Sequence, residues 1–316
     1  MTLMEILTQV LEVIAALAAA PLFLGWVNQC RAWLQNRSAP SLWLPYRGIR
    51  KLFHKDAVIA ESASPLFRIA PYIVFGAMAV AAAIIPSMGT RLPLTTAADA
   101  IALVGLLATA RVFMSLAAMD VGTAFGTLGA RREMMVGFLA EPALLMVIFV
   151  ASLISATTAL PAITEHLATQ APALYPSLAF TAIAFTMVLL AENARIPIDN
   201  PATHLELTMI HEAMLLEYSA RHLALMEWAA ALKLFNYACI GFALFIPWGV
   251  STGADSPAAL LASIPLLAVK LAMAGAGLAL IETVSAKLRV FRVPEFLTAA
   301  FLLAVLGLLV HLLLRA

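Results

Sequence analysis

Apolar residues run in long uninterrupted stretches along this chain, and short polar segments separate them. An α-helix needs about 20 apolar residues to cross the hydrocarbon core of a bilayer, whereas β-barrel strands would show short alternating segments. The pattern predicts an all-α polytopic membrane protein whose single transmembrane domain fills residues 1–316. About eight spans are expected: Leu3–Val27, Ile69–Met88, Ala98–Met119, Val136–Leu160, Pro176–Asn193, Ala224–Gly249, Ala258–Ile281 and Pro294–Leu314.

Lysine and arginine gather on one side of these predicted spans. Four connections hold 14 of the 19 Lys and Arg residues, and the opposite ends and loops hold only two. Because basic residues of short loops stay in the cytoplasm, these connections are predicted to be cytoplasmic. An even number of spans then places both termini on the outer side. The four connections are 28–68, 120–135, 194–223 and 282–293.

Composition narrows the chemistry further. The chain is 63% hydrophobic and 12% charged, with a mean hydropathy of +0.96, and its net charge of +1 gives no indication of nucleic-acid binding. Cys30 and Cys239 are too few for an iron–sulfur cluster, which takes four thiolates. His211-Glu212 begins like a zinc-protease helix, but Leu215 stands where a second histidine is needed. With no glycine-rich phosphate loop either, no metal, cofactor or nucleotide is expected in this chain.

Two cytoplasmic connections are long enough to contain helices of their own. Segment 28–68 mixes basic and aromatic residues, which predicts an amphipathic helix at the surface of anionic lipid. In segment 194–223, Asn200 is a predicted N-cap and Pro201 the first helical residue. One face of that helix would carry a stripe of residues that includes two acids. The stripe is either exposed to solvent or part of a functional site, and the flanking spans favour a functional site. The stripe consists of Glu206, Ile210, Ala213 and Glu217.

Ionisable residues inside the predicted spans are the main candidates for function. Six of the 18 acidic residues lie between Glu192 and Lys233, and charges in hydrocarbon are costly unless they pair, face water or carry protons. Glu12 and Lys270 lie near the middle of their spans and need internal partners, whereas Glu227 and Glu282 lie near span ends and can snorkel. We expect a polar track, reached from the cytoplasm, that passes protons or responds to charge. Its acids are Glu141, Glu192, Glu206 and Glu217.

The chain resembles the NADH dehydrogenase subunit 1 family, and within it the hydrogenase branch of formate hydrogenlyase and hydrogenase-4-type membrane subunits. Ala191–Ser219 resembles the family signature Ala-Glu-x-x-Arg-x-Pro-Asp-x-Pro, followed by Glu-Tyr-Ser. Gln35–Phe53 resembles the first cytoplasmic loop, and Gly129–Glu141 resembles the segment that presents a glutamate. The likeness covers essentially the whole chain.

The resemblance implies a non-catalytic subunit in a bacterial or archaeal inner membrane. Such a subunit anchors a peripheral arm of hydrogenase large subunit and iron–sulfur subunits, which hold the nickel–iron centre and the iron–sulfur clusters. It also starts an acidic relay toward antiporter-like membrane subunits. By position, the relay and cavity residues would be Glu141, Glu192, Asp199, Glu206 and Glu217, to which we add Lys270. The interface residues would be Arg37, Arg47, Lys51 and Arg195.

Some positions depart from the family pattern and bear on the choice between branches. Ala39-Pro40 stands where Gly-Pro is usual, Trp43 where Gln is common, and Gly48 where an acid is common. These differences weaken the case for a quinone site. They favour a hydrogenase complex that couples electron transfer to proton or sodium movement. The alternatives are the quinone-cavity subunit of a complex I-like NADH:quinone oxidoreductase, a stand-alone secondary transporter and a purely structural anchor. A transporter would usually show paired repeats, which this sequence lacks.

Overall fold

The computed structural model describes residues 3–90, 93–96, 99–169, 175–199, 209–251 and 257–315. Within these ranges every regular element is helical, apart from two isolated β-bridges. The predicted all-α architecture is therefore confirmed. The helices are α1 (Leu3–Leu34), α2 (Leu44–Phe53), α3 (Pro65–Ile84), η1 (Pro93–Thr96), α4 (Ala100–Asp120), α5 (Ala124–Ser155), α6 (Leu160–Thr169), α7 (Pro176–Glu192), α8 (His211–Leu215), α9 (Ala220–Phe245), α10 (Pro257–Val284), η2 (Val290–Arg292) and α11 (Val293–Arg315).

Seven helices in the described ranges are long and apolar enough to cross a membrane: α1, α3, α4, α5, α9, α10 and α11. An eighth apolar helix, α7, has 17 residues, which is at the short end of the length that can span a bilayer. Each of the eight predicted spans thus corresponds to one helix of the structure, and the chain is a multi-pass membrane protein.

Local sequence signals fix where several of these helices begin. The Ser64 side chain accepts a hydrogen bond from the Leu66 N–H at the start of α3, and Pro65 occupies the first helical position. The Asp99 carboxylate accepts the Ile101 N–H at the start of α4. These side chains satisfy N–H groups that the first turn of a helix leaves without a partner.

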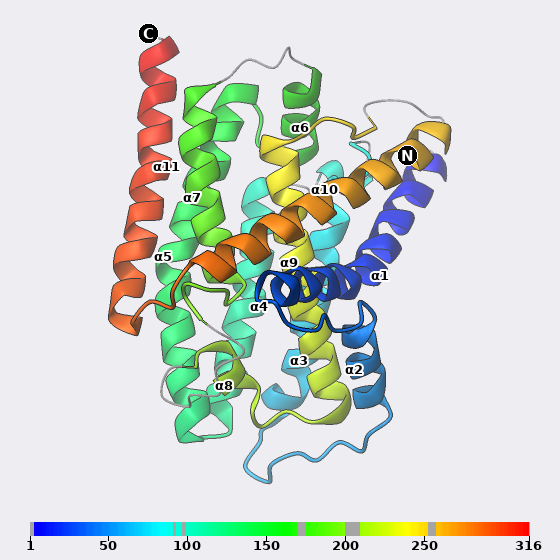
Figure 1. The fold of residues 1–316 in the computed structure, drawn as a ribbon, viewed down its shortest axis with the longest axis vertical. Helices are drawn as coiled ribbons and strands as arrows, with labels where there is room; N and C mark the ends of the chain where they lie inside the picture. The colour runs from blue at the N-terminus through cyan, green and yellow to red at the C-terminus, as the bar shows by residue number, and fades with distance from the viewer. Residues whose placement is uncertain are drawn as a thin grey trace.

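The helices form a bundle with α9 near its centre (Figure 1). Helices α5, α7 and α11 run alongside one another, α4 packs on α5, and α3 packs on both α4 and α9. Helices α1 and α10 pack together and cross the bundle obliquely. Both chain ends lie toward one end of the molecule, and α2 and α8 lie toward the other, in agreement with the predicted sidedness of termini and long connections (Figure 1).

Two connections differ from the prediction. Connection 120–135 is mostly helical, because α5 begins at Ala124 after a Thr123 side chain that accepts the Gly126 N–H. The long helix predicted in segment 194–223 is wrong in the described part, where α8 covers only His211–Leu215 and has Ile210 as its N-cap. The predicted cap, Asn200 with Pro201, lies outside the described residues. Helix α2 does provide the amphipathic helix predicted in segment 28–68.

A carboxylate explains why α8 begins where it does. Asp199 accepts the backbone N–H groups of Ile210 and His211 at 3.1 and 3.3 Å, so an acid eleven residues earlier in the chain caps this helix. Gly129 of α5 lets α8 approach closely, because a Cβ at that position would lie 2.7 Å from the Ile210 carbonyl oxygen. The short helix is thereby held against the inner part of the bundle.

Candidate functional site

Arg111 is the centre of a buried charge cluster in the middle of the bundle. Its side chain is 4% exposed and forms ion pairs with carboxylates from three positions on two other helices. Nη1 lies 2.6 Å from Glu141 Oε1, and Nε lies 3.5 Å from Glu133 Oε1, both on α5. Nη2 donates to Glu192 Oε1 at the end of α7. One arginine of α4 therefore connects the charged residues of α5 and α7.

Glu192 is the most enclosed acid of this cluster. Its side chain is 1% exposed, and its second oxygen, Oε2, lies 3.0 Å from Lys233 Nζ of α9. The Tyr237 phenol, one turn further along α9, lies next to the same carboxylate. Two cations from two helices thus hold one carboxylate, which offsets the large cost of burying its charge.

The cluster has more acids than bases. With Glu133, Glu141 and Glu192 ionised against Arg111 and Lys233, the net charge is −3 + 2 = −1. A net charge is costly away from water, so binding one proton would make the cluster neutral. Glu141 contacts a single cation and is 32% exposed, which makes it the least enclosed of the three acids.

A glycine makes room for the arginine. A Cβ on Gly137 would lie 2.1 Å from Arg111 Nη1 and 2.7 Å from Arg111 Cδ. Gly137 lies on α5 between Glu133 and Glu141, one turn from each, so any side chain here would occupy the space of the guanidinium. This position therefore belongs to the charge cluster although it carries no charge.

A second group of ion pairs lies where the helices end. Glu282 of α10 is buried and pairs with Arg195 at 3.2 Å and with Arg31 at 3.5 Å. Lys287 lies 3.1 Å from Asp199 Oδ1. These contacts connect α1, the segment after α7 and the segment after α10.

A cavity of about 490 Å³ connects the two groups of charges. Its walls come from α1, α2, the end of α7, residues 193–199, α8 and α9. Half of its 20 lining residues are polar or charged: Asn28, Arg31, Glu192, Asn193, Arg195, Asp199, His211, Glu212, Glu227 and Lys233. Pockets for small organic ligands are lined mainly by apolar and aromatic groups, and no aromatic side chain other than His211 lines this one. The walls therefore combine charged groups with apolar surface.

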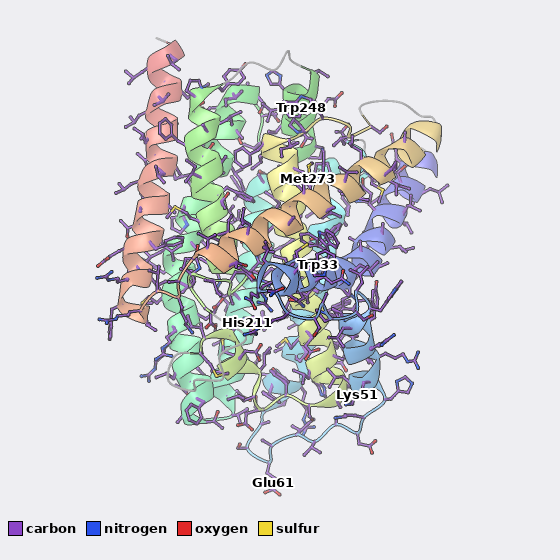
Figure 2. All side chains as sticks on the ribbon, in the orientation of Figure 1. Trp33, Lys51, Glu61, His211, Trp248 and Met273 are labelled. Atoms are coloured by element: carbon purple, nitrogen blue, oxygen red, sulfur yellow. The ribbon has the colours of Figure 1, made fainter. Side chains whose placement is uncertain are left out.

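Burial also sets the state of His211, which lies outside the membrane spans at the cavity wall. Removal from water lowers its pKa below the ordinary value of 6.5, and the nearby acids Glu133, Glu212 and Asp199 offset this only in part. Figure 2 shows His211 toward the interior, and Lys51 and Glu61 toward the end that carries α2. At neutral pH the imidazole is therefore uncharged and can both accept and donate a hydrogen bond.

The structure brings together some of the predicted relay residues and separates others. Glu141 and Glu192 share Arg111, and Asp199 lies in the cavity wall. Lys270 is not part of this cluster, because its Nζ donates to the Ile246 carbonyl at the far end of α9. Glu217 is half-buried in the turn after α8 and does not line the cavity. Glu206 lies outside the described residues.

The predicted interface residues differ in their exposure. Arg37, Arg47 and Lys51 are exposed, the last two on α2. Arg195 is not on the surface: it is 7% exposed, pairs with Glu282 and lines the cavity. Glu282 was expected to snorkel, and that expectation is wrong, since the carboxylate is buried against two arginines.

Several residues of the site were not chosen from the sequence. Glu133 falls in a predicted connection, and Arg111 and Lys233 are not among the predicted site residues. The available signal was spacing: Glu133, Gly137 and Glu141 recur every four residues and so share one face of α5.

Among the described residues, no group of three or more His, Cys, Asp and Glu side chains is arranged to hold a metal ion. Cys30 and Cys239 are free and buried.

Sequence comparison relates the chain to components of hydrogenase complexes. The sequence profile of the NADH dehydrogenase family matches residues 7–313. Formate hydrogenlyase subunit 4 of Escherichia coli (strain K12) is 32% identical over 303 residues, covering 94% of this chain and 96% of that protein. Hydrogenase-4 component C of the same organism is 35% identical over 240 residues, covering 75% of this chain and 74% of that protein.

A solved structure has the same fold. A chain of the membrane-bound sulfane sulfur reductase, an archaeal respiratory membrane complex, superposes with a TM-score of 0.83 at 20% identity, over 95% of this chain and 97% of its own length. The profile match and the two curated relatives confirm the resemblance drawn from the signature at Glu192–Pro201: the chain belongs to the NADH dehydrogenase family.

Proposed function

We propose that this chain is the membrane anchor and ion-coupling subunit of a hydrogenase complex of the formate hydrogenlyase or hydrogenase-4 type. It docks a peripheral hydrogenase arm and connects electron transfer in that arm to proton or sodium movement. The observation that carries the proposal is the Arg111 cluster, in which three carboxylates and two cations lie inside a membrane bundle and adjoin a charged cavity. Its two curated relatives are both components of hydrogenase assemblies by name.

The cavity supports coupling through its position. It lies beside α2 and α8, at the end of the molecule opposite the chain termini, and basic residues concentrate in the connections at that end. We infer that this end faces the cytoplasm, that both termini face outward and that the protein resides in the inner membrane. A redox arm docked here would sit over the cavity, with its nickel–iron centre and iron–sulfur clusters close enough to act electrostatically on the carboxylates below.

The chemistry assigned to this chain is proton binding and charge response. A charge change above the cavity alters the proton affinity of the nearest carboxylates. Because the cluster carries one net negative charge when all its groups are ionised, it can take up one proton and pass it on. Glu141 is the acid that exchanges protons, and Glu192 is the fixed charge that keeps Arg111 and Lys233 in place. The protons would leave toward antiporter-like membrane subunits.

The rival function is that of a quinone-reductase subunit, for which the same cavity would hold a quinone headgroup. The volume is sufficient, and apolar as well as charged residues line the walls. Affinity purification through this chain, followed by mass spectrometry and activity assays, decides between the two. Recovery of a hydrogenase large subunit and iron–sulfur subunits with hydrogenase activity supports the proposal, whereas quinone reduction without hydrogenase activity would replace it with the rival.

A further inference from the structure

Another buried acid lies on α1, outside the Arg111 cluster. Glu12 is 1% exposed, and one of its two carboxylate oxygens, Oε1, accepts the backbone N–H groups of both Met88 and Gly89 at 2.8 Å. These residues follow α3, in a segment that pairs with Ser251 beyond α9 through the hydrogen bonds Thr90 N–H to Ser251 O and Ser251 N–H to Met88 O. One oxygen of Glu12 therefore has a structural role.

The other carboxylate oxygen, Oε2, has no such structural role. Glu12 Oε2 is buried and lacks a hydrogen-bond partner within the described part of the chain. A buried carboxylate oxygen without a donor is costly, and a bound proton removes that cost by neutralising the charge. Oε1 thus holds the segment that contains Met88 and Gly89, whereas Oε2 is available to bind a proton.

A buried cation lies on α10. Lys270 of α10 is 6% exposed, and its Nζ donates to the Ile246 carbonyl at the end of α9 at 2.6 Å and lies 5.8 Å from the centre of the Phe242 ring. The charges of Glu12 and Lys270 both act on the thiol of Cys239 on α9. The titratable group that faces Glu12 is thus Cys239 from α9, while the segment after α3 provides backbone N–H groups.

Helix α9 connects this site to the Arg111 cluster. Lys233, Asn236 and Cys239 follow at intervals of three residues on neighbouring turns, and the six residues from Lys233 to Cys239 rise about 9 Å along the helix. Asn236 lies between them and is 1% exposed. Its Nδ2 donates to Met78 O, and its buried Oδ1 lacks a hydrogen-bond partner among the described residues. A buried polar group with an open acceptor thus lies along α9 between Lys233 and Cys239.

We propose that Glu12 is a second proton-carrying carboxyl, at the outer end of a polar line along α9, and that it releases to the outer side protons that reach it from the Arg111 cluster. A proton binds to Oε2 and leaves as a hydrated proton, while Oε1 keeps the N–H groups of Met88 and Gly89. The inference rests on the proposed function for the origin of the protons, and it adds an exit within this chain itself.

The two oxygens allow the structural and the proton-carrying roles to be tested separately. Glu12→Gln keeps a carbonyl oxygen for Met88 and Gly89 and replaces Oε2 with an amide, whereas Glu12→Ala removes both oxygens. Glu5→Gln, on the same helix but only half-buried, is the matched control. The complete complex is purified for each variant, and infrared difference spectra between acidic and alkaline pH are recorded. We expect Glu12→Gln to lose one carboxyl C=O band that the wild type and Glu5→Gln retain; unchanged spectra would overturn the proposal.

Proton release to the outer side of vesicles, energised by hydrogen oxidation and reported by a pH-sensitive dye, gives the second readout. In Glu12→Gln the rate should fall on the order of a hundredfold, the scale on which one positioned proton-transfer group acts. A wild-type rate in Glu12→Gln together with failed assembly of Glu12→Ala would reduce Glu12 to a structural cap and overturn the proposal. If the proposed function itself were wrong, proton release would also continue in Glu192→Gln. That result distinguishes failure of the proposed function from failure of the Glu12 proposal.

Discussion

Lys233 of α9 lies 3.0 Å from the Glu192 carboxylate at the end of α7, on the side of the carboxylate that Arg111 does not occupy. A single acid is therefore held by cations from two further helices, and 81 residues separate it from Arg111 in sequence. Such an arrangement keeps Glu192 ionised and leaves Glu141, which has one cation and partial exposure, to exchange protons. The division between a fixed acid and an exchanging acid leads to specific expectations.

Gly137→Ala tests whether the position of Arg111 matters apart from its charge. The new methyl group would lie 2.1 Å from Arg111 Nη1, so the guanidinium has to move away from Glu141 or Glu192. We expect the complex to assemble with hydrogenase activity but with strongly reduced hydrogen-driven proton movement in membrane vesicles. Gly105→Ala is the matched control, because a Cβ there has no neighbouring atom within 4 Å. Equal proton movement in the two variants would show that Arg111 need not occupy this position.

Glu282→Gln tests the ion pairs that Glu282 forms with Arg195 and Arg31 at the cavity wall. Loss of this charge leaves Arg195 and Arg31 without their carboxylate, and removing one partner of a buried pair costs about 3 to 5 kcal/mol. The purified complex should show a clearly lower thermal unfolding midpoint. Lys287→Met removes a partner of Asp199 that is 22% exposed, so its effect should be smaller. The opposite order of the two variants would contradict the assigned burial.

The pH dependence of stability should reflect His211. Its folded-state pKa is lowered from 6.5 by burial, so below pH 6.5 the unfolded chain binds a proton that the folded chain does not. Stability from this group is complete above 6.5 and declines as pH falls from 6.5 toward the lowered folded-state value. Thermal midpoints of the complex, measured across this window, should decline more steeply in wild type than in His211→Gln. A steeper decline in the variant would contradict the sign.

Helix α2 should contribute to docking of the peripheral arm. Arg47 and Lys51 are exposed on it, and reversal of a charge at an interface weakens association with a complementary partner. In Arg47→Glu with Lys51→Glu, we expect the membrane subunit to accumulate normally and to lose most of its co-purified hydrogenase large subunit. Glu61→Lys, a reversal outside α2, is the control. Retention of the arm in the α2 variant would place the interface elsewhere.

The length of the apolar runs was sufficient to predict the membrane helices, since each predicted span corresponds to one helix of the structure. It could not predict which charges meet. Arg111, Glu133 and Glu192 come from α4, α5 and α7, and only tertiary packing brings them within ion-pair distance. The spacing of Glu133, Gly137 and Glu141 would have indicated a shared face if the start of α5 had been assigned correctly.

The pairing of Glu282 with Arg195 could not be predicted from the sequence. Position near a span end suggested snorkelling for Glu282, which is wrong, and the family resemblance implied a partner interface for Arg195. The structure pairs the two residues inside the molecule, because the oblique α10 brings its C-terminal end against the segment that follows α7. The direction of a helix within the bundle is not encoded in its hydrophobicity, so neither residue could be placed from sequence alone.

The most direct test of the account is hydrogen-driven proton movement by the complete complex in sealed vesicles, compared between wild type and Glu192→Gln. Removing this charge leaves Arg111 and Lys233 without the carboxylate that holds them. We predict normal hydrogenase activity with an artificial electron carrier and loss of proton movement in the variant. Proton movement at the wild-type rate in Glu192→Gln, with the complex intact, would contradict the claim that this buried cluster couples electron transfer to ions.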